Sequence, residues 1–191
     1  CKDKALKLWN AAADSVSASL PYIVKKGIRP IGARQLRNQL LIPMYQIDLE
    51  DPKKPSLVMV SLQIITEAET DDGGKEIKKV FLTGTPKKGS FSLLAPPGTP
   101  EYDTVYVCEG WATGCSIYQA TQKPVYVAFD AGNLDSVIAS IKQIEKAKIV
   151  IAADNDCHYH TKLKNDFKAK YGVDLELTDE GAEKFKTATE E

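Results

Sequence analysis

The stretch Thr104-Val105-Tyr106-Val107-Cys108-Glu109-Gly110 decides the fold, because it is a short apolar run that ends in a carboxylate and a glycine. Two further apolar runs follow at residues 124–129 and 148–153. Helical patterns separate the runs, one reaching to about Thr121 and one placing Leu134 and its apolar successors on one face. Continuous apolar strands that alternate with helices are typical of a parallel sheet with helices on both faces. We therefore predict an α/β domain over residues 100–191.

The sequence before residue 100 indicates a different organisation. Asp71-Asp72-Gly73-Gly74 is a strong hairpin-turn signal, because glycine accepts the positive φ that such turns need. We predict a small β-rich (α+β) subdomain over residues 20–99 with antiparallel pairing. Its predicted strands are residues 40–47, 57–65, 79–84 and 91–94.

An N-terminal helix is predicted over residues 2–18, in a separate segment at 1–19. Leu6, Trp9, Ala13 and Val16 recur near one helical face, and Pro21 breaks the pattern.

Composition limits the class of protein. The 191 residues are 43% hydrophobic and 27% charged, with a net charge of −1, which is typical of a globular protein. A membrane partner is not expected, since no apolar run reaches about 18 residues. The four cysteines are too few for a disulfide scaffold, so we expect reduced thiols and a cytoplasmic location.

Charge is distributed unevenly along the chain. Residues 1–100 hold fifteen Lys and Arg against ten Asp and Glu, whereas residues 101–191 hold ten against sixteen. A basic half beside an acidic half suits a protein that binds phosphates with one part and metal ions with the other; two solvated faces are the alternative. The candidate phosphate-binding residues are Lys26, Arg29, Arg34, Arg37 and Lys88, with Lys25 and Lys87 beside them.

Carboxylates follow each predicted strand of the α/β domain. Glu109 ends the first strand, Asp130 ends the second, and Asp154 and Asp156 end the third. Because ligands bind beyond the carboxyl ends of parallel strands, we expect these side chains to meet at one edge. Carboxylates that converge need a cation, and hard oxygen ligands suit Mg²⁺ or Mn²⁺. Gly110 is expected to allow a sharp turn and to leave room for a phosphate.

Three segments of this domain carry a family resemblance. Val107–Thr113, Ala131–Leu134 and Ile151–Asp156 resemble the Toprim domain of plasmid- and phage-type DNA primases and primase–helicases. The region that precedes Toprim in those proteins is similar to several upstream segments, and Gly181–Lys184 is similar to the helix after the Asp-x-Asp strand. The upstream segments are Lys26-Gly27-Ile28, Arg34, Leu41-Ile42-Pro43, Phe81–Gly84 and Lys88-Gly89.

The resemblance implies Mg²⁺-dependent nucleotidyl transfer, in which ribonucleoside triphosphates are joined into primers on a single-stranded DNA template. It implies that Glu109 is the acid/base residue and a metal ligand, and that Asp154 and Asp156 bind Mg²⁺. Asp130 stands where small residues are more usual, so it is either a further metal contact or a solvated edge residue. Two divalent ions can hold the attacking and leaving oxygens of a displacement at phosphorus.

Complete proteins of this type carry a zinc-binding module upstream and often a helicase downstream, and both are expected as fused or associated partners. The sequence has neither, and the last Toprim strand is missing, so we expect a C-terminally truncated catalytic core whose activity alone is open. Alternatives are a non-catalytic nucleic-acid-binding Toprim module and another Toprim phosphotransfer enzyme, such as a nuclease or topoisomerase. The cluster Cys157-His158-Tyr159-His160 is either a surface loop or a zinc site.

Overall fold

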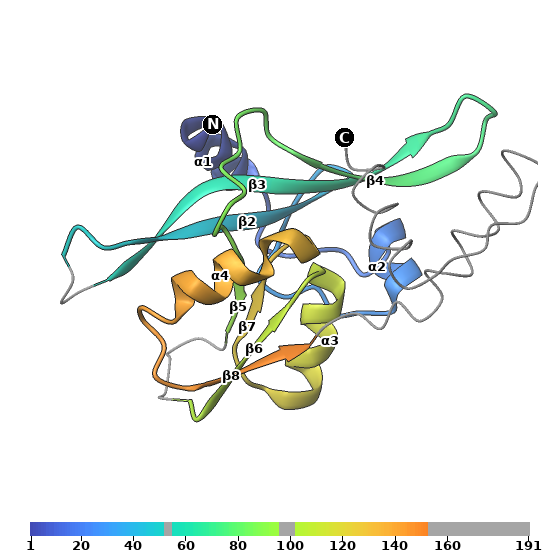
Figure 1. Ribbon diagram of the computed structural model, residues 1–191. Helices are drawn as coiled ribbons and strands as arrows, with labels where there is room; N and C mark the ends of the chain where they lie inside the picture. The colour runs from blue at the N-terminus through green and yellow to red at the C-terminus, as the bar shows by residue number, and fades with distance from the viewer. Residues whose placement is uncertain (52–54, 96–101, 153–191) are drawn as a thin grey trace, which may run out of the picture. The chain divides into compact units, whose positions relative to one another are not determined.

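The parallel sheet predicted after residue 100 is one of two four-stranded sheets in the computed structural model (Figure 1), which describes residues 1–51, 55–95 and 102–152. Its strands are β5 (Ser92–Leu94), β6 (Thr104–Cys108), β7 (Val125–Val127) and β8 (Lys148–Ala152). The strand order is β5-β7-β6-β8, and β6 is parallel to both of its neighbours. The α/β fold class is therefore confirmed.

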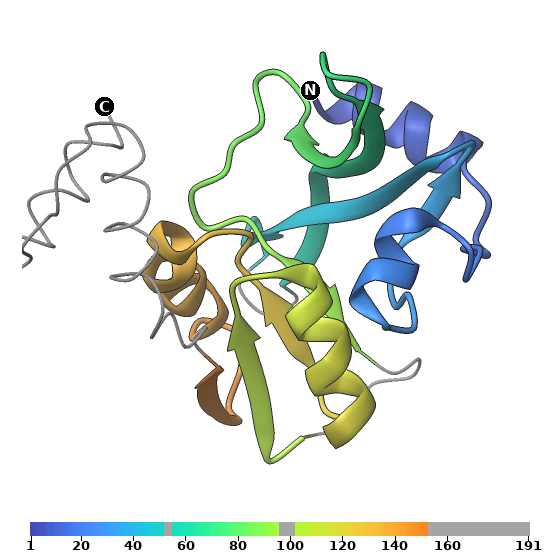
Figure 2. The ribbon, with the colours of Figure 1, turned by 90° about the vertical axis from the view of Figure 1, so that its right-hand side faces the viewer.

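Helices cover both faces of this sheet, as predicted (Figure 2). Helix α3 (Trp111–Thr121) packs in one core with Cys108 of β6. Helix α4 (Leu134–Ile141) packs in a second core with Val107, the neighbour of Cys108. Successive strand residues point to opposite faces, so one apolar strand contributes to both cores.

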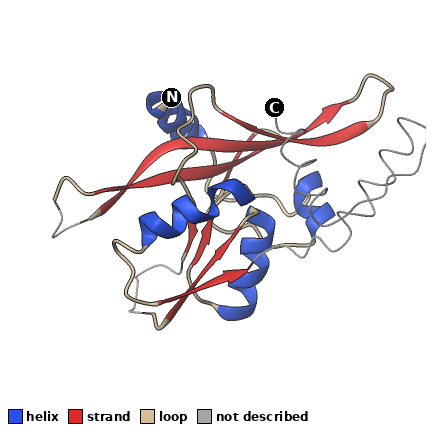
Figure 3. Ribbon diagram, in the orientation of Figure 1, coloured by secondary structure: helices blue, strands red, loops and turns tan. Residues whose placement is uncertain are grey.

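The β-rich part forms an antiparallel sheet of order β1-β2-β3-β4. Figure 3 draws its long strands in red. Its strands are β1 (Arg34–Leu36), β2 (Gln39–Asp48), β3 (Ser56–Glu69) and β4 (Lys75–Phe81). The predicted antiparallel pairing is confirmed.

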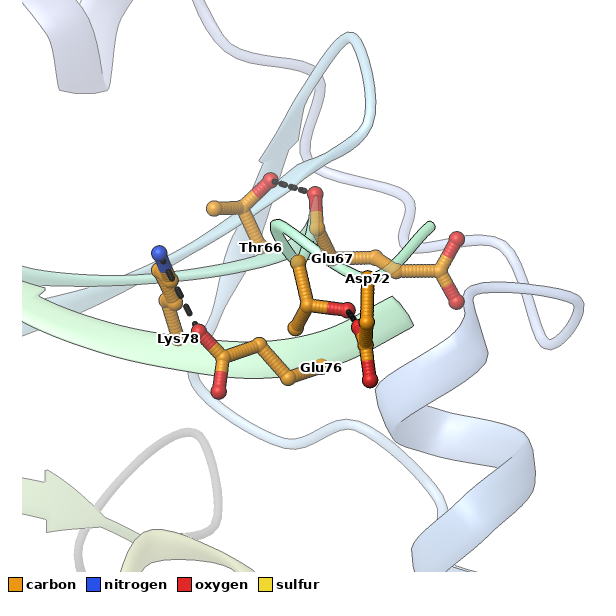
Figure 4. Close-up of polar contacts among 6 residues, drawn as sticks. Thr66, Glu67, Asp72, Glu76 and Lys78 are labelled. Atoms are coloured by element: carbon orange, nitrogen blue, oxygen red, sulfur yellow. Dashed lines mark hydrogen bonds and ion pairs between the residues drawn. The ribbon is translucent and has the colours of Figure 1, made fainter. Parts of the chain in front are cut away.

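The strands β3 and β4 extend further toward the hairpin turn than predicted. The ladder continues to the pair Glu69–Lys75, beside the predicted turn. Asp72 closes that turn by accepting hydrogen bonds from the Thr70 hydroxyl and, at 3.2 Å, from the Gly74 amide; the ion pair of Lys78 with Glu76 lies beside it (Figure 4). The predicted extension of the second strand to residue 84 is wrong, because a turn occupies residues 82–85 with Gly84 at φ 78°.

The predicted helix over residues 2–18 is also wrong in length. Helix α1 (Lys2–Ala11) ends early because Ala13 exchanges two backbone hydrogen bonds, of 2.8 and 2.9 Å, with Gln35 of β1. Pro21 then starts a second helix, α2 (Pro21–Lys26), at a position where a missing N–H costs nothing.

The strand predicted at residues 91–94 joins the parallel sheet instead of the long hairpin. β5 pairs antiparallel with β7. Phe91, just before it, exchanges backbone hydrogen bonds of 2.7 and 3.0 Å with Tyr45 of β2. The chain before residue 100 therefore contributes an edge strand to the sheet that carries Glu109.

In the described ranges, no helix is long and apolar enough to cross a membrane.

Candidate active site at the carboxyl edge of the parallel sheet

Glu109 is the first residue after β6, the central parallel strand, and it is partly buried. Its backbone carbonyl accepts a hydrogen bond of 2.8 Å from the Phe129 amide, and the Cys108 carbonyl accepts one of 2.8 Å from Ala128. These bonds join the ends of β6 and β7. The predicted acid/base residue is therefore held by the backbone at the edge where ligands bind in parallel sheets.

Asp130 lies at the same edge, one residue beyond the Phe129 amide that Glu109 holds. It is partly buried, and its carbonyl accepts a hydrogen bond of 3.3 Å from Asn133 at the start of the short 3-10 helix η1 (Ala131–Asn133). The structure thus brings two of the predicted carboxylate residues to neighbouring strand ends, and their role toward a metal stays a prediction.

The third strand meets the same edge. Ala152, the last residue of β8, pairs with Cys108 in the parallel register, so β8 and β6 end together. The predicted ligands Asp154 and Asp156, and the cluster of Cys157, His158 and His160, lie outside the described residues. Within the residues that are described, no three His, Cys, Asp or Glu side chains form a group that could hold a metal ion.

Gly110 differs from the expectation of a sharp turn. Its φ is −95° and its ψ is 143°, a conformation that any residue adopts, and it stands as the N-terminal cap position of α3. A Cβ at this position would lie 3.5 Å from the Thr113 hydroxyl, an ordinary contact. The conformational freedom of glycine is therefore not what this position needs, and the proposed room for a phosphate stays a prediction.

Phe129, which precedes Asp130 and donates its amide hydrogen to the Glu109 carbonyl, has an unusual backbone conformation. Its φ is 73°, a region that a bulky side chain rarely occupies. Its ring packs edge-on against Phe81 of β4, with centroids 5.8 Å apart, and the Lys87 ammonium lies 4.5 Å from the centre of the Phe81 ring. The β3–β4 hairpin thus reaches the edge that carries Glu109.

Asn133 is a positioning residue next to this edge that the sequence does not predict. It is 6% exposed, and its side-chain amide donates to the carbonyls of Ser90 and Ala128 at 2.9 Å each. Its side-chain oxygen accepts a hydrogen bond of 2.8 Å from the Gly89 amide. The bonds fasten residues 89 and 90 to the end of β7. In the sequence, Ala131–Leu134 carries only the family resemblance, and nothing in it indicates the distant partner.

Trp111 lies next to the same edge, because it begins α3 directly after Glu109-Gly110. Its indole N–H donates to the Ile31 carbonyl at 3.2 Å, and its ring stacks on Tyr22 of α2 at 6.4 Å. Burial raises the pKa of Tyr22 to about 12, with the nearby Cys115 thiol adding to the shift. The Lys79 ammonium of β4 lies over the Tyr22 ring, 5.5 Å from its centroid. These contacts make Trp111 a core residue.

Arg34 already has partners within the protein. Its guanidinium pairs with Asp14 at 2.5 Å, donates to the Trp9 carbonyl at 2.9 Å and lies 4.7 Å from the centre of the Trp9 ring. The arginine therefore ties the segment after α1 to β1. Its predicted phosphate contact remains a prediction beside this structural role.

The other predicted phosphate-binding residues are exposed. Lys26 ends α2, and Arg29 follows it in the loop to β1. Arg37 occupies the β1–β2 turn with φ 54°. Lys88 precedes the glycine that Asn133 holds, and its carbonyl accepts a hydrogen bond of 3.4 Å from Gln46. Of the group, Lys88 has the most direct link to the carboxylate edge.

Comparison with known proteins adds one finding. Residues 104–190 match the family described as the Toprim domain. No curated protein and no solved structure matches the chain. Toprim domains occur in enzymes that act on nucleic acids, typically with Mg²⁺, so the match indicates a nucleic-acid-related function. The matched segment begins at the first residue of β6 and includes Glu109 and Asp130. A Toprim domain is thus found over residues 104–190.

Proposed function

We propose that the chain is the catalytic core of a DNA primase, which joins ribonucleotides on single-stranded DNA by Mg²⁺-dependent nucleotidyl transfer. The observation that carries the proposal is the position of Glu109. It closes the central strand of the parallel sheet, beside the end of β7 and within a Toprim domain. The primase assignment rests in addition on the upstream resemblance, since other Toprim enzymes share the sheet.

Carboxylates at this edge fit a divalent metal ion by their chemistry. Glu109 and Asp130 supply hard oxygen donors from neighbouring strand ends, and Asp154 and Asp156 follow β8 in the sequence. We propose Glu109, Asp154 and Asp156 as the residues that hold Mg²⁺ or Mn²⁺, with Asp130 as a further contact. The ion would neutralise phosphate charge and help to position the attacking oxygen.

In this proposal the residues of the chain have separate tasks. Glu109 accepts the proton of the attacking ribose hydroxyl, which needs a carboxylate that is fixed and partly shielded from water. The backbone bond from Phe129 to Glu109 limits how far that residue can move. The exposed cations Lys26, Arg29, Arg37 and Lys88, with Arg34, contact the phosphates of the template or the nucleotide. Phosphate contacts of this kind give binding that depends on salt and not on sequence.

Metal titration tests the site directly. Mn²⁺ affinity is compared among the parent protein, Glu109→Gln and Asp154→Asn, with Asp135→Asn as the matched control. Asp135 is an exposed carboxylate in the first turn of α4. We expect both site variants to weaken Mn²⁺ binding by tenfold or more and the control to leave it unchanged. Unchanged affinity in both site variants contradicts the metal site.

Primer synthesis on single-stranded DNA then separates the remaining functions. Dinucleotide formation that Glu109→Gln abolishes supports the primase proposal. Metal binding with neither synthesis nor cleavage indicates the non-catalytic nucleic-acid-binding module. Cleavage or relaxation of DNA in place of synthesis indicates a nuclease-like or topoisomerase-like Toprim enzyme.

A further inference from the structure

The loop at residues 86–90 brings two exposed lysines to the edge of the sheet that carries Glu109. Asn133 binds this loop at Gly89 and at Ser90, and the same amide group binds Ala128 at the end of β7. Inside the loop, the Ser90 amide donates to the Lys87 carbonyl at 3.0 Å and the Ser90 hydroxyl donates to the Pro86 carbonyl at 2.5 Å. These hydrogen bonds fix the backbone of the loop that carries Lys87.

The side chain of Lys87 is also held in place. Its ammonium lies 4.5 Å from the centre of the Phe81 ring, within the range of a cation–π interaction. Phe81 in turn packs on Phe129, whose amide donates to the Glu109 carbonyl. A lysine normally loses rotamer freedom when it binds an anion, and an aromatic ring that already confines the side chain reduces that loss.

A cationic side chain at this edge would act on a phosphate together with the proposed metal ion. Glu109 and Asp130 both lie there, and a phosphate that approaches two carboxylates is repelled unless positive charge accompanies it. Lys87 supplies such a charge from a strongly exposed position. In the part of the chain that the structure describes, the contact that holds its ammonium is the Phe81 ring, which leaves the N–H donors that face away from the ring available to a ligand.

We propose that Lys87, held over Phe81 on the loop that Asn133 fixes to β7, is a phosphate-binding residue for the substrate acted on at the Glu109 edge. The inference rests on the proposed function for the identity of that substrate. The ligand chemistry is a phosphate oxyanion, which either a nucleoside triphosphate or the backbone of single-stranded nucleic acid can supply. Lys87 and its neighbour Lys88 both belong to the basic group identified in the sequence, whereas the anchoring of Lys87 is visible only in the folded chain.

Binding without metal tests this residue independently of catalysis. A labelled oligothymidylate is titrated in the presence of a chelator over a range of salt concentrations, and inorganic triphosphate is tested as competitor. The variants are Lys87→Ala, Lys87→Arg and Phe81→Leu. Lys142→Ala is the matched control, because Lys142 is an exposed lysine at the far end of α4.

We expect Lys87→Ala to weaken binding about five- to tenfold and to reduce the salt slope by about 0.7, the loss of one phosphate contact on a single strand. Lys87→Arg should retain most of the affinity. Phe81→Leu should weaken binding about two- to threefold, because the lysine stays but its position is no longer fixed. Lys142→Ala should bind like the parent protein.

The outcomes separate the sources and the hypotheses. Weaker binding of the oligothymidylate assigns Lys87 to the nucleic-acid backbone, and loss of triphosphate competition alone assigns it to the nucleotide. Parent-like binding of both ligands by Lys87→Ala overturns the proposal, as does an equal loss in Lys142→Ala. These titrations contain no metal ion, whereas the catalytic assignment is tested by Mn²⁺ binding and primer synthesis, so a failure of the catalytic assignment leaves the result for Lys87 intact.

Discussion

The amide of Phe129 donates a hydrogen bond of 2.8 Å to the carbonyl of Glu109 and joins the ends of two parallel strands. Phe129 has φ 73° where the chain leaves β7, a conformation that costs about 1–3 kcal/mol for a residue other than glycine. Its ring packs on Phe81 at the same time. One strained residue thus connects the proposed acid/base position with the preceding hairpin.

Phe129 allows the strain to be measured. Phe129→Gly and Phe129→Ala both remove the ring, but only alanine keeps the penalty of a positive φ. We expect the glycine variant to be more stable than the alanine variant by about 1 kcal/mol in urea unfolding. At Ala112, inside α3, the order should reverse, and Ala112→Gly should lose about 1 kcal/mol. Equal stability of the two Phe129 variants would argue against the strained backbone.

Asn133 should be costly to replace. Asn133→Ala leaves the Gly89 amide and the carbonyls of Ser90 and Ala128 without their side-chain partner, in a buried place. We expect a loss of about 2–4 kcal/mol in the free energy of unfolding and faster hydrogen exchange of the Gly89 amide. Asn38→Ala, at an exposed asparagine in the β1–β2 turn, should change stability by less than about 0.5 kcal/mol. Slow exchange at Gly89 in the variant would contradict the role of the side chain.

The Asp72 carboxyl should make the stability of the β3–β4 turn depend on pH. Hydrogen bonds from the Thr70 hydroxyl and then from the Gly74 amide lower the pKa of Asp72. A lowered pKa in the folded state means that the turn is stabilised above the unfolded pKa of about 3.9, and that this stabilisation disappears as the pH falls through the folded pKa.

A carbon-detected NMR titration of the Asp72 carboxyl measures this effect. The parent protein should titrate below the usual range of aspartate, and the protection of the Gly74 amide relative to its intrinsic exchange rate should decrease at the acid end. Thr70→Val removes the first donor and should return the pKa most of the way to normal. A normal Asp72 pKa in the parent protein would show that the turn does not depend on this carboxylate.

The contacts of Arg34 should differ in strength. Its ion pair with Asp14 is exposed, since the Asp14 side chain is 83% accessible, whereas the Arg34 side chain is 27% accessible and its guanidinium lies over the Trp9 ring. We expect Asp14→Asn to cost less than about 0.5 kcal/mol and Arg34→Ala to cost about 1–2 kcal/mol in urea unfolding. Equal losses in the two variants would indicate that the ion pair, and not the contacts with Trp9, holds the segment.

Local patterns in the sequence predicted much of the core. The apolar runs around Val107 and Tyr126 are buried strands, and the spacing around Val137 indicates a helix with one apolar face. The run around Val150 forms β8, the edge strand of the described sheet, where Ile151 is exposed, so its burial was predicted wrongly. The hairpin turn at Asp72 was equally local, because its residues carry the turn geometry themselves. The same kind of reasoning failed at Ala13, where helical spacing continues but pairing with Gln35 ends the helix.

Residue types and their order were enough to determine a parallel sheet with helices on both faces and carboxylates at the strand ends. The tertiary structure decided the association of distant segments. It placed β5 beside β7, Gly89 beside Asn133 and Lys87 over Phe81. Secondary-structure signals arise from neighbours along the chain, whereas each of these pairs depends on which surfaces become buried together when the whole chain folds.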